Sequence, residues 1–337
     1  MRTIEWNNGA VDTIDQTKLP NDVVIIRMKT CDDVAEAIGT MKIRGAPLLG
    51  ASAAFALALT AFHSKATNRE KLLRELQESA EAIRKTRPTA VNLFWALDRI
   101  MGKAQAISAD CAALANFVVE EAKRIADEDV AANHLIGRHG AELVQDRDVI
   151  LTHCNAGALA TVDYGTALGV IRAAWGQGKR IRVFSDETRP LLQGARLTAY
   201  ELKRDGIPVT LITDDMAGYV MSKHMVNMVI VGADRIVKDA VVNKIGTFTV
   251  AVLAREHKIP FYVAAPKSTF DMDKTSAEVV IEQRKPEEVT VMSGNRIAPE
   301  GVDVFNPAFD ITPLDYVTAI ICEDGILSRH DFSRFNA

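Results

Sequence analysis

The stretch Val149-Ile150-Leu151-Thr152-His153-Cys154 joins a short apolar run directly to threonine, histidine and cysteine. Continuous rather than alternating hydrophobicity is typical of strands buried on both faces of a parallel sheet. Helical segments separate most of the later runs, which are Ile181–Phe184, Val209–Ile212, Met228–Val231, Phe261–Ala264 and Ala319–Ile321. The sequence therefore predicts an α/β fold with a doubly wound parallel sheet over residues 146–337.

Residues 1–140 follow a different pattern. Short strands are expected at Thr3–Trp6 and Val23–Met28, around a middle rich in turn residues. From Cys31 to about Gly140, apolar residues recur at helical spacing. The Ala/Leu-rich stretch Leu48–Phe62 is the nearest approach to a membrane span, but it is shorter than the roughly 20 residues required. We expect a small β element followed by a helical bundle, as an N-terminal domain.

Composition excludes several classes of function. A net charge of −4 over 337 residues gives no basic surplus for nucleic acid. No signal peptide is expected in Met1–Trp6, and the cysteines form no CxxC pair, so a reduced cytoplasmic protein is predicted. There is neither a GxGxxG fingerprint after a strand nor a P-loop. No histidine or carboxylate spacing predicts a metal site. We expect no cofactor, no metal and no membrane partner.

Polar residues follow the apolar runs where each predicted strand ends. In open parallel sheets, ligands bind outside the carboxyl ends of the strands, so these residues predict the rim of a cleft. They are Thr152-His153-Cys154-Asn155, Ser185-Asp186-Glu187-Thr188, Thr213-Asp214-Asp215, Gly232-Ala233-Asp234-Arg235 and Pro266-Lys267-Ser268-Thr269.

Cys154 and Asp234 are the strongest candidates for catalysis. Small residues after Cys154 lead towards a helix, whose N-terminus attracts anions and should lower the pKa of the thiol. The alternative is a buried cysteine acting as a small apolar residue. Asp234 leaves an apolar strand, so burial should raise its pKa and make it a general acid. Its alternatives are a helix cap or a partner for Arg235.

Binding candidates are found at other turns. Arg44-Gly45-Ala46-Pro47 precedes an Ala-rich helix and suits an anion. Asn243 and Lys244 suit sugar hydroxyls or phosphate, although a solvated loop is equally compatible. Gln193 either faces the cleft or belongs to the first turn of a helix, and Arg87 reads as a surface charge.

Taken together and in order, these motifs resemble the methylthioribose-1-phosphate isomerase family. They are Arg44-Gly45-Ala46-Pro47, Lys85-Thr86-Arg87-Pro88-Thr89, Thr152-His153-Cys154-Asn155-Ala156-Gly157, Glu187-Thr188-Arg189-Pro190-Leu191-Leu192-Gln193-Gly194, Gly232-Ala233-Asp234-Arg235-Ile236 and Asn243-Lys244-Ile245-Gly246-Thr247. The resemblance implies a Rossmann-like C-terminal domain, a helical N-terminal domain and a homodimer, as in regulatory subunits of translation initiation factor 2B.

The resemblance also implies a reaction, the conversion of 5-methylthioribose 1-phosphate to 5-methylthioribulose 1-phosphate in methionine salvage. By motif, Cys154 and Asp234 match the catalytic positions. Positions that match substrate-binding residues are Arg44, Gly45, Ala46, Arg87, Gln193, Asn243 and Lys244. The segment between Asp234 and Asn243 is one residue shorter than in many members, which leaves the substituent at sugar carbon 5 open.

Three alternatives remain at this point. The same reaction on 5-deoxyribose 1-phosphate or ribose 1,5-bisphosphate would need a different pocket at carbon 5. A non-catalytic subunit resembling initiation factor 2B would not need the cysteine and aspartate pair. A dehydrogenase is disfavoured by the missing glycine fingerprint.

For the isomerase, Asp234 is expected to protonate the ring oxygen, and Cys154 acts either as a base or as a group that stabilises charge.

Overall fold

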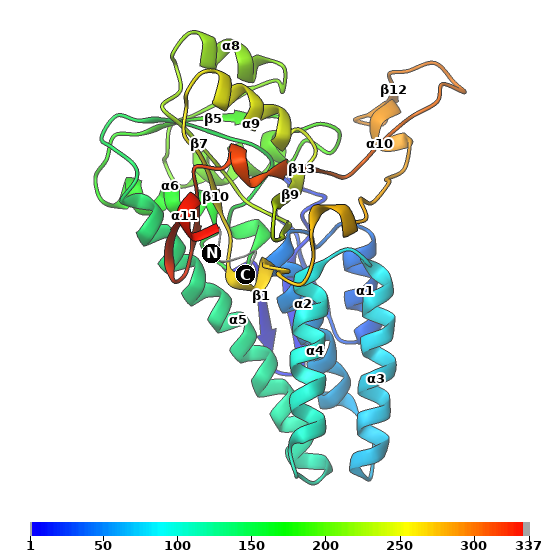
Figure 1. The fold of residues 1–337 in the computed structure, drawn as a ribbon. Helices are drawn as coiled ribbons and strands as arrows, with labels where there is room; N and C mark the ends of the chain where they lie inside the picture. The colour runs from blue at the N-terminus through cyan, green and yellow to red at the C-terminus, as the bar shows by residue number, and fades with distance from the viewer. Residues whose placement is uncertain (1, 333–337) are drawn as a thin grey trace.

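The computed structural model describes residues 2–332 and contains one large sheet beside a helical bundle (Figure 1). The sheet has seven strands in the order β15-β14-β10-β7-β4-β5-β6, and all neighbours are parallel except β14 and β15. Its strands are β4 (Val149–Thr152), β5 (Arg182–Asp186), β6 (Val209–Ile212), β7 (Met228–Val231), β10 (Phe261–Ala264), β14 (Ala319–Cys322) and β15 (Gly325–Ser328). The predicted doubly wound sheet is confirmed, with β15 as an added antiparallel edge.

Helices cover both faces of this sheet. One face packs against the end of α5 and against α6 and α7, whose apolar residues include Ile136, Leu168 and Leu202. The other face packs against α8 and α9 through Ala217, Val220 and Val250. The bounds are α6 (Ala167–Gly176), α7 (Ala199–Arg204), α8 (Met216–Ser222), α9 (Thr247–Glu256) and the short α11 (Arg329–Phe332).

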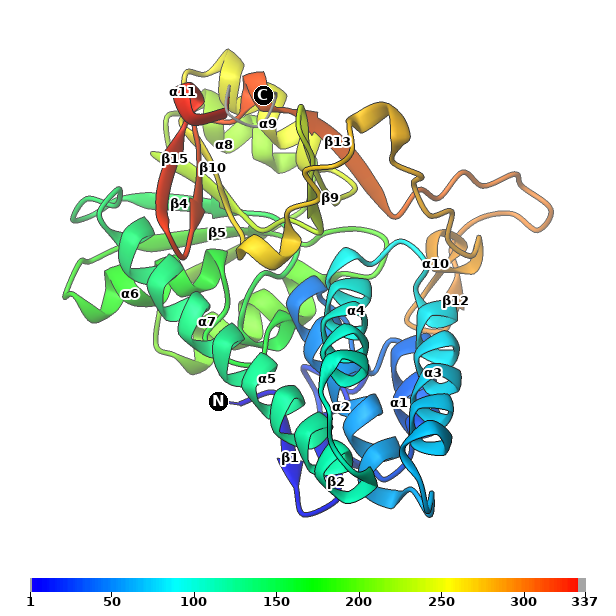
Figure 2. The same cartoon turned by 60° about the horizontal axis from the view of Figure 1, so that its bottom comes forward.

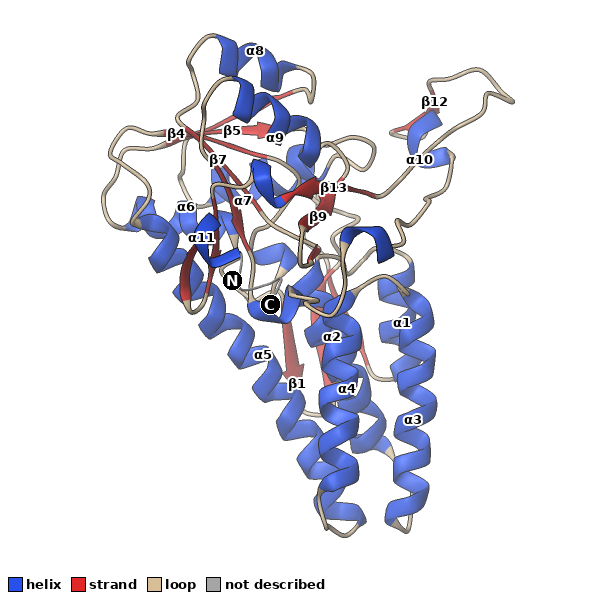
Figure 3. Ribbon diagram, viewed as in Figure 1, coloured by secondary structure: helices blue, strands red, loops and turns tan. Residues whose placement is uncertain are grey.

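The bundle surrounds one buried helix, α2 (Figure 3). By length and composition α2 could cross a membrane, but most of its residues are buried among the neighbouring helices, as its apolar sequence predicts for a core helix. The bundle consists of α1 (Cys31–Gly39), α2 (Ala46–His63), α3 (Arg69–Thr86), α4 (Val91–Ala106) and α5 (Cys111–Ala141). The 31-residue α5 continues from the bundle to the sheet.

Several elements differ from the prediction. The N-terminal sheet has three strands, β1 (Ile4–Asn7), β2 (Ala10–Ile14) and β3 (Ile25–Met28), so β2 occupies part of the expected turn region. Residues 191–203 form a π-helical turn at Gly194–Thr198 before α7 rather than one regular helix.

A second small sheet was not predicted. It contains β8 (Arg235–Ile236), β9 (Ala240–Lys244) and β13 (Phe309–Pro313), in the order β13-β9-β8. A surface arm with α10 (Glu287–Thr290), β11 (Val291–Met292) and β12 (Asn295–Arg296) projects away from both parts (Figure 2). The arm is an insertion between β10 and β13, which belong to the two sheets.

Candidate active site

The sheet changes direction between β4 and β7. From β4 the chain proceeds outward through β5 to β6, whereas β7, β10 and β14 extend the sheet on the other side. This switch leaves a crevice at the carboxyl ends of β4 and β7, where doubly wound proteins bind ligands. Cys154 follows β4 and Asp234 follows β7. The two catalytic candidates are therefore carried by adjacent strands.

One cavity of about 690 Å³, partly open to solvent, lies at this crevice. We call it the central cavity. All of the site residues predicted from sequence line it: Arg44, Gly45, Ala46, Arg87, Cys154, Gln193, Asp234, Asn243 and Lys244. The bundle supplies the first four, the segments that follow strands of the large sheet supply Cys154, Gln193 and Asp234, and the small second sheet supplies Asn243 and Lys244. The structure thus brings together residues that are separated by up to 200 positions in the chain.

The turn before α2 fits closely into the wall of the central cavity. Gly45 caps α2 at φ 103°, a conformation in which side chains are strained. A Cβ on Gly45 would lie 2.5 Å from Cα of Ala160, so glycine is required here. The first backbone N–H groups of α2 have no acceptor within the helix, so they are available to bind an anion.

Arg44 is buried behind this turn. Its guanidinium donates hydrogen bonds to Oε1 of Gln16 (2.8 Å) and to the carbonyl oxygen of Asn155 (3.0 Å), and it also bonds Oδ1 of Asn155. These contacts attach the bundle to the turn after Cys154. Arg44 therefore holds the two walls of the cavity together while placing a positive charge beside Cys154 and Asp234.

Cys154 is held at φ 64° by hydrogen bonds from its backbone. Its N–H donates to Oγ1 of Thr188 (2.8 Å), and its carbonyl accepts from Oγ1 of Thr198 (2.6 Å). The expected lowering of the thiol pKa is wrong. Burial raises the pKa of Cys154, although Lys244 and Arg44 oppose the change. The segment after Cys154 forms only a 3₁₀ turn at Ala158–Ala160, so it does not supply the helix N-terminus that the sequence predicted there.

Burial also raises the pKa of Asp234, against the opposing effects of Lys244, Arg87 and Arg44. The expected direction is confirmed. Arg235 has other partners, since its guanidinium donates to the carbonyl of Thr89 (2.7 Å) and lies 3.5 Å from Asp271. A carboxyl whose pKa is raised by burial and which lines a cavity is suited to act as a general acid.

Asn243 and Lys244 lie at the end of strand β9 rather than in a solvated loop. The ammonium of Lys244 donates to the carbonyl of Ala308 (2.8 Å) and lies 4.8 Å from the ring centroid of Phe309. Burial lowers its pKa, opposed by Cys154 and Asp234. Asn243 donates to Oγ1 of Thr247 (3.0 Å). The small second sheet therefore places a cation close enough to influence the pKa of both catalytic candidates.

Arg87 and Gln193 also face the central cavity. The expectation of a surface charge at Arg87 is wrong, because its side chain is only 11% exposed and lies 3.5 Å from the carboxylate of Glu282. Gln193 is buried, and its Oε1 has no hydrogen-bond partner among the described residues. An unpaired buried oxygen lining a cavity suits a ligand hydroxyl.

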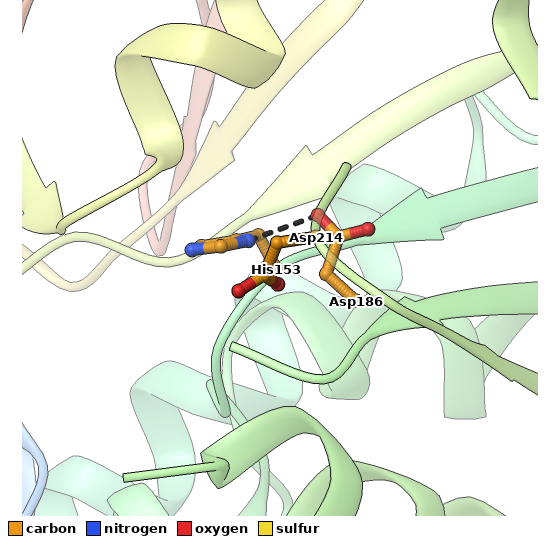
Figure 4. Close-up of side chains that lie close together, drawn as sticks. All are labelled: His153, Asp186 and Asp214. Atoms are coloured by element: carbon orange, nitrogen blue, oxygen red, sulfur yellow. Dashed lines mark hydrogen bonds and ion pairs between the residues drawn. The ribbon is translucent and has the colours of Figure 1, made fainter. Parts of the chain in front are cut away.

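Three polar residues to which sequence reasoning gave no individual role lie close together at the carboxyl ends of β4, β5 and β6: His153, Asp186 and Asp214 (Figure 4). Both ring nitrogens of His153 are occupied, Nδ1 by Asp186 and Nε2 by the carbonyl of Ile245, each at 2.9 Å. Asp214 accepts the backbone N–H groups of Thr188 and Arg189. Because the imidazole has no lone pair to offer, these residues do not fit a metal ion. The feature of the sequence that pointed to these three residues was their position at the ends of predicted strands.

The chain has a doubly wound α/β fold, and its central cavity is lined by cations and by a helix N-terminus, groups that suit a small anion. Comparison with known proteins is consistent with this class. The model of the Initiation factor 2 subunit family matches residues 42–329. The chain therefore belongs to this family, among its isomerases.

Two curated relatives cover nearly all of the chain. The methylthioribose-1-phosphate isomerase of Thermosipho africanus is 54% identical over 333 residues, covering 96% of this chain and 94% of its own. The 5-deoxyribose 1-phosphate isomerase of Moorella thermoacetica is also 54% identical, over 327 residues, covering 96% and 93%.

Solved structures of similar fold belong to the same group of proteins. The 5-methylthioribose 1-phosphate isomerase of Pyrococcus horikoshii superposes with a TM-score of 0.91 at 47% identity, covering 99% of this chain and 94% of its own. A protein of A. fulgidus described as subunit delta of translation initiation factor eIF-2B gives a TM-score of 0.87 at 51% identity, covering 98% and 96%.

Proposed function

We propose that this protein is an aldose–ketose isomerase that converts 5-methylthioribose 1-phosphate to 5-methylthioribulose 1-phosphate. The observation that carries the proposal is the convergence of Cys154 and Asp234 on one cavity from adjacent strands at the switch point. A non-catalytic initiation-factor subunit would have no need of this convergence. The names of the relatives support the isomerase.

In the proposed reaction, the N-terminus of α2 and the nearby cations hold the phosphate at sugar carbon 1. Protonated Asp234 donates its proton to the ring oxygen, and the bond between this oxygen and carbon 1 breaks. A hydrogen then moves from carbon 2 to carbon 1, and the hydroxyl at carbon 2 releases its proton to the carboxylate of Asp234 as it becomes the ketone, so the acid is regenerated. The shelter of the cavity favours retention of the phosphate, because it keeps water from the reactive intermediate.

The state of Cys154 bears on how the hydrogen moves. Because burial raises the pKa of its thiol, the resting sulfur is protonated at neutral pH and is a poor base. We therefore favour a direct hydride shift, with Cys154 stabilising charge. Turnover in deuterium oxide should then leave carbon 1 of the product essentially free of solvent deuterium. Incorporation of one deuterium per turnover would assign proton abstraction instead.

An apolar chamber of about 410 Å³ extends from the central cavity, with which it shares Ala46, Leu49, Arg87, Asp234 and Phe309. Its other walls are Thr89, Ala90, Arg235, Val242, Val279, Val280 and Ile281. The guanidinium of Arg235 already donates to the carbonyl of Thr89 and lies 3.5 Å from Asp271. Such a chamber suits an uncharged substituent at carbon 5. It therefore favours a thiomethyl or deoxy sugar over a second phosphate.

A second phosphate would also find few free cations nearby. A neighbouring groove shares Arg44 and Gln193 with the central cavity and contains the cations Arg196, Arg284 and Lys285. Arg284, however, forms ion pairs with Glu282 and Glu288, and Arg196 donates to backbone carbonyls, including that of Gln16. Ribose 1,5-bisphosphate is therefore the less suitable substrate.

Replacing Ile281 tests this assignment of the apolar chamber. Ile281→Lys should lower kcat/KM for 5-methylthioribose 1-phosphate by about tenfold or more, because a charge replaces apolar contact with the thiomethyl group. The Ile281→Met control, which keeps an apolar side chain of similar size, should stay within about threefold. The assay compares 5-methylthioribose 1-phosphate, 5-deoxyribose 1-phosphate and ribose 1,5-bisphosphate on all three proteins. Equal loss for every substrate would show that the chamber does not receive carbon 5, and turnover of none would contradict the proposed function.

A further inference from the structure

His153 and Asp186 form a buried pair, and His153, which precedes Cys154 in the chain, contributes to the wall of the central cavity. Their side chains are 1% and 0% exposed, and Nδ1 of His153 lies 2.9 Å from Oδ2 of Asp186. On the other side of the ring, Nε2 lies 2.9 Å from the carbonyl oxygen of Ile245. The pair therefore links the end of β4, which carries Cys154, to the end of β9, which carries Lys244.

These contacts determine how many protons the pair holds. A backbone carbonyl only accepts, so Nε2 of His153 must carry a hydrogen. If Asp186 were ionised and Nδ1 bare, two lone pairs would face each other at 2.9 Å in a dry interior. One proton must therefore lie between Nδ1 and Oδ2, on either atom. In both forms the pair has no net charge.

The surroundings favour retention of this proton. Oδ1 of Asp186 is buried without a hydrogen-bond partner in the described part of the chain, which disfavours an ionised carboxylate. Burial raises the pKa of Asp186, and the nearby Asp214 acts in the same direction. Burial alone would lower the pKa of His153, but its bonds to Asp186 and Ile245 leave it raised. Asp310 also faces the ring.

The ring of His153 fits tightly against the turn that follows Lys244. A Cβ on Gly246 would lie 2.7–2.8 Å from Cε1 and Nε2 of the ring, so only glycine allows this approach. The N–H of Gly246 donates to Asp310 (2.7 Å), which fixes the turn from the other side. A change at the ring must therefore move the turn, and with it the end of β9.

We propose that His153 and Asp186 are positioning residues, a proton-sharing latch that fixes the end of β9 and so holds the ammonium of Lys244 against the Cys154 thiol. Only the predicted effect of the latch on turnover rests on the proposed function. Its structural effect, the influence of Lys244 on the sulfur, is measurable without substrate.

Matched variants of His153 separate the two links of the latch. Glutamine places an N–H near the position of Nε2 and keeps the bond to Ile245, whereas asparagine imitates only Nδ1. His153→Asn should lower kcat by about 10²-fold, because Lys244 moves by about an ångström, with little change in KM. His153→Gln should retain kcat within about fivefold. Asp186→Asn should also retain kcat, because its amide N–H supplies the proton to Nδ1.

The thiol itself gives an independent measurement. The rate of Cys154 alkylation by iodoacetamide, followed against pH by peptide mass spectrometry without substrate, reports its pKa. We expect His153→Asn to raise this pKa relative to the unsubstituted protein and His153→Gln to leave it nearly unchanged. If both variants gave the same thiol pKa as the unsubstituted protein, with thermal unfolding showing them folded, the latch would be overturned even if turnover were normal. A changed thiol pKa in a protein that turns over no sugar phosphate would support the latch and contradict the proposed function.

Discussion

Asp234→Asn should abolish nearly all turnover, with kcat reduced by about 10²- to 10⁴-fold and substrate binding little changed. The amide keeps the shape of the side chain, but it has no acidic proton to donate to a ring oxygen. Because Asp234 is useful only while protonated, its pKa, raised by burial, also predicts that activity falls as pH rises through that pKa. Steady-state kinetics and a binding titration of the variant measure both effects.

Asp215→Asn is the matched control. Asp215 also follows a parallel strand, β6, but its exposed side chain bonds Thr213 and does not line the central cavity. Its kcat should be unchanged. Comparable losses in the two variants would mean that the rim carboxylates act through general electrostatics, and the role of Asp234 as the acid would have to be given up.

Stability provides a second readout of Asp234. Its pKa in the folded protein lies above the ordinary 3.8, so its contribution to stability is fully present below pH 3.8 and is lost as pH rises through the raised value. Asparagine does not titrate. The Tm of Asp234→Asn should therefore increase relative to that of the unsubstituted protein as pH rises through this window.

Cys154→Ala and Cys154→Ser should each lower kcat by about 10²-fold or more, because neither side chain offers a polarisable sulfur beside the reacting carbons. The alternative role, a small apolar residue in a tight turn, predicts a different pattern: a lower Tm with kcat preserved. Measuring kcat and Tm on the same preparations separates the two. Full activity in Cys154→Ser would remove this residue from the chemistry.

Cys322→Ala gives the comparison for Cys154. Cys322 also ends a parallel strand, β14, and is buried, but it does not line the central cavity. Its removal should lower the free energy of unfolding slightly and leave kcat intact. Both cysteines lie at carboxyl ends of strands in the same sheet, with β7 and β10 between those strands. The comparison therefore tests position within the sheet rather than cysteine chemistry in general.

Most of the large sheet could be predicted because its strands are buried on both faces. Runs such as Val149–Leu151 and Met228–Val231 are apolar throughout, and burial alone imposes that pattern. The second sheet was not predicted, for two reasons. The polar pair Asn243-Lys244 at the end of β9 suggests a loop, and β9 pairs with β13, which lies about 70 residues later in the chain. Long-range pairing of this kind leaves no periodic signal in the sequence.

The membership of the candidate site was predictable, but its electrostatics only in part: the raised pKa of Asp234 was predicted and that of Cys154 was not. Strand ends converge wherever a parallel sheet forms, so Cys154 and Asp234 were expected to share a cleft. The thiol pKa was predicted in the wrong direction because local sequence suggests a helix N-terminus but does not reveal the depth of burial. The contact between His153 and Asp186 depends on the register of β4 against β5, in which Thr152 pairs with Ser185.

The walls of the apolar chamber have an evolutionary consequence. The groups proposed to act on carbons 1 and 2 are fixed by the core of the sheet, whereas Val279–Ile281 belong to the surface excursion that leads into α10. Mutations in that excursion are free of the packing demands that constrain the core. Descendants of one ancestor can therefore change the tail of the sugar they accept while inheriting the same reaction, and two relatives equally similar to this chain bear names that differ in that tail.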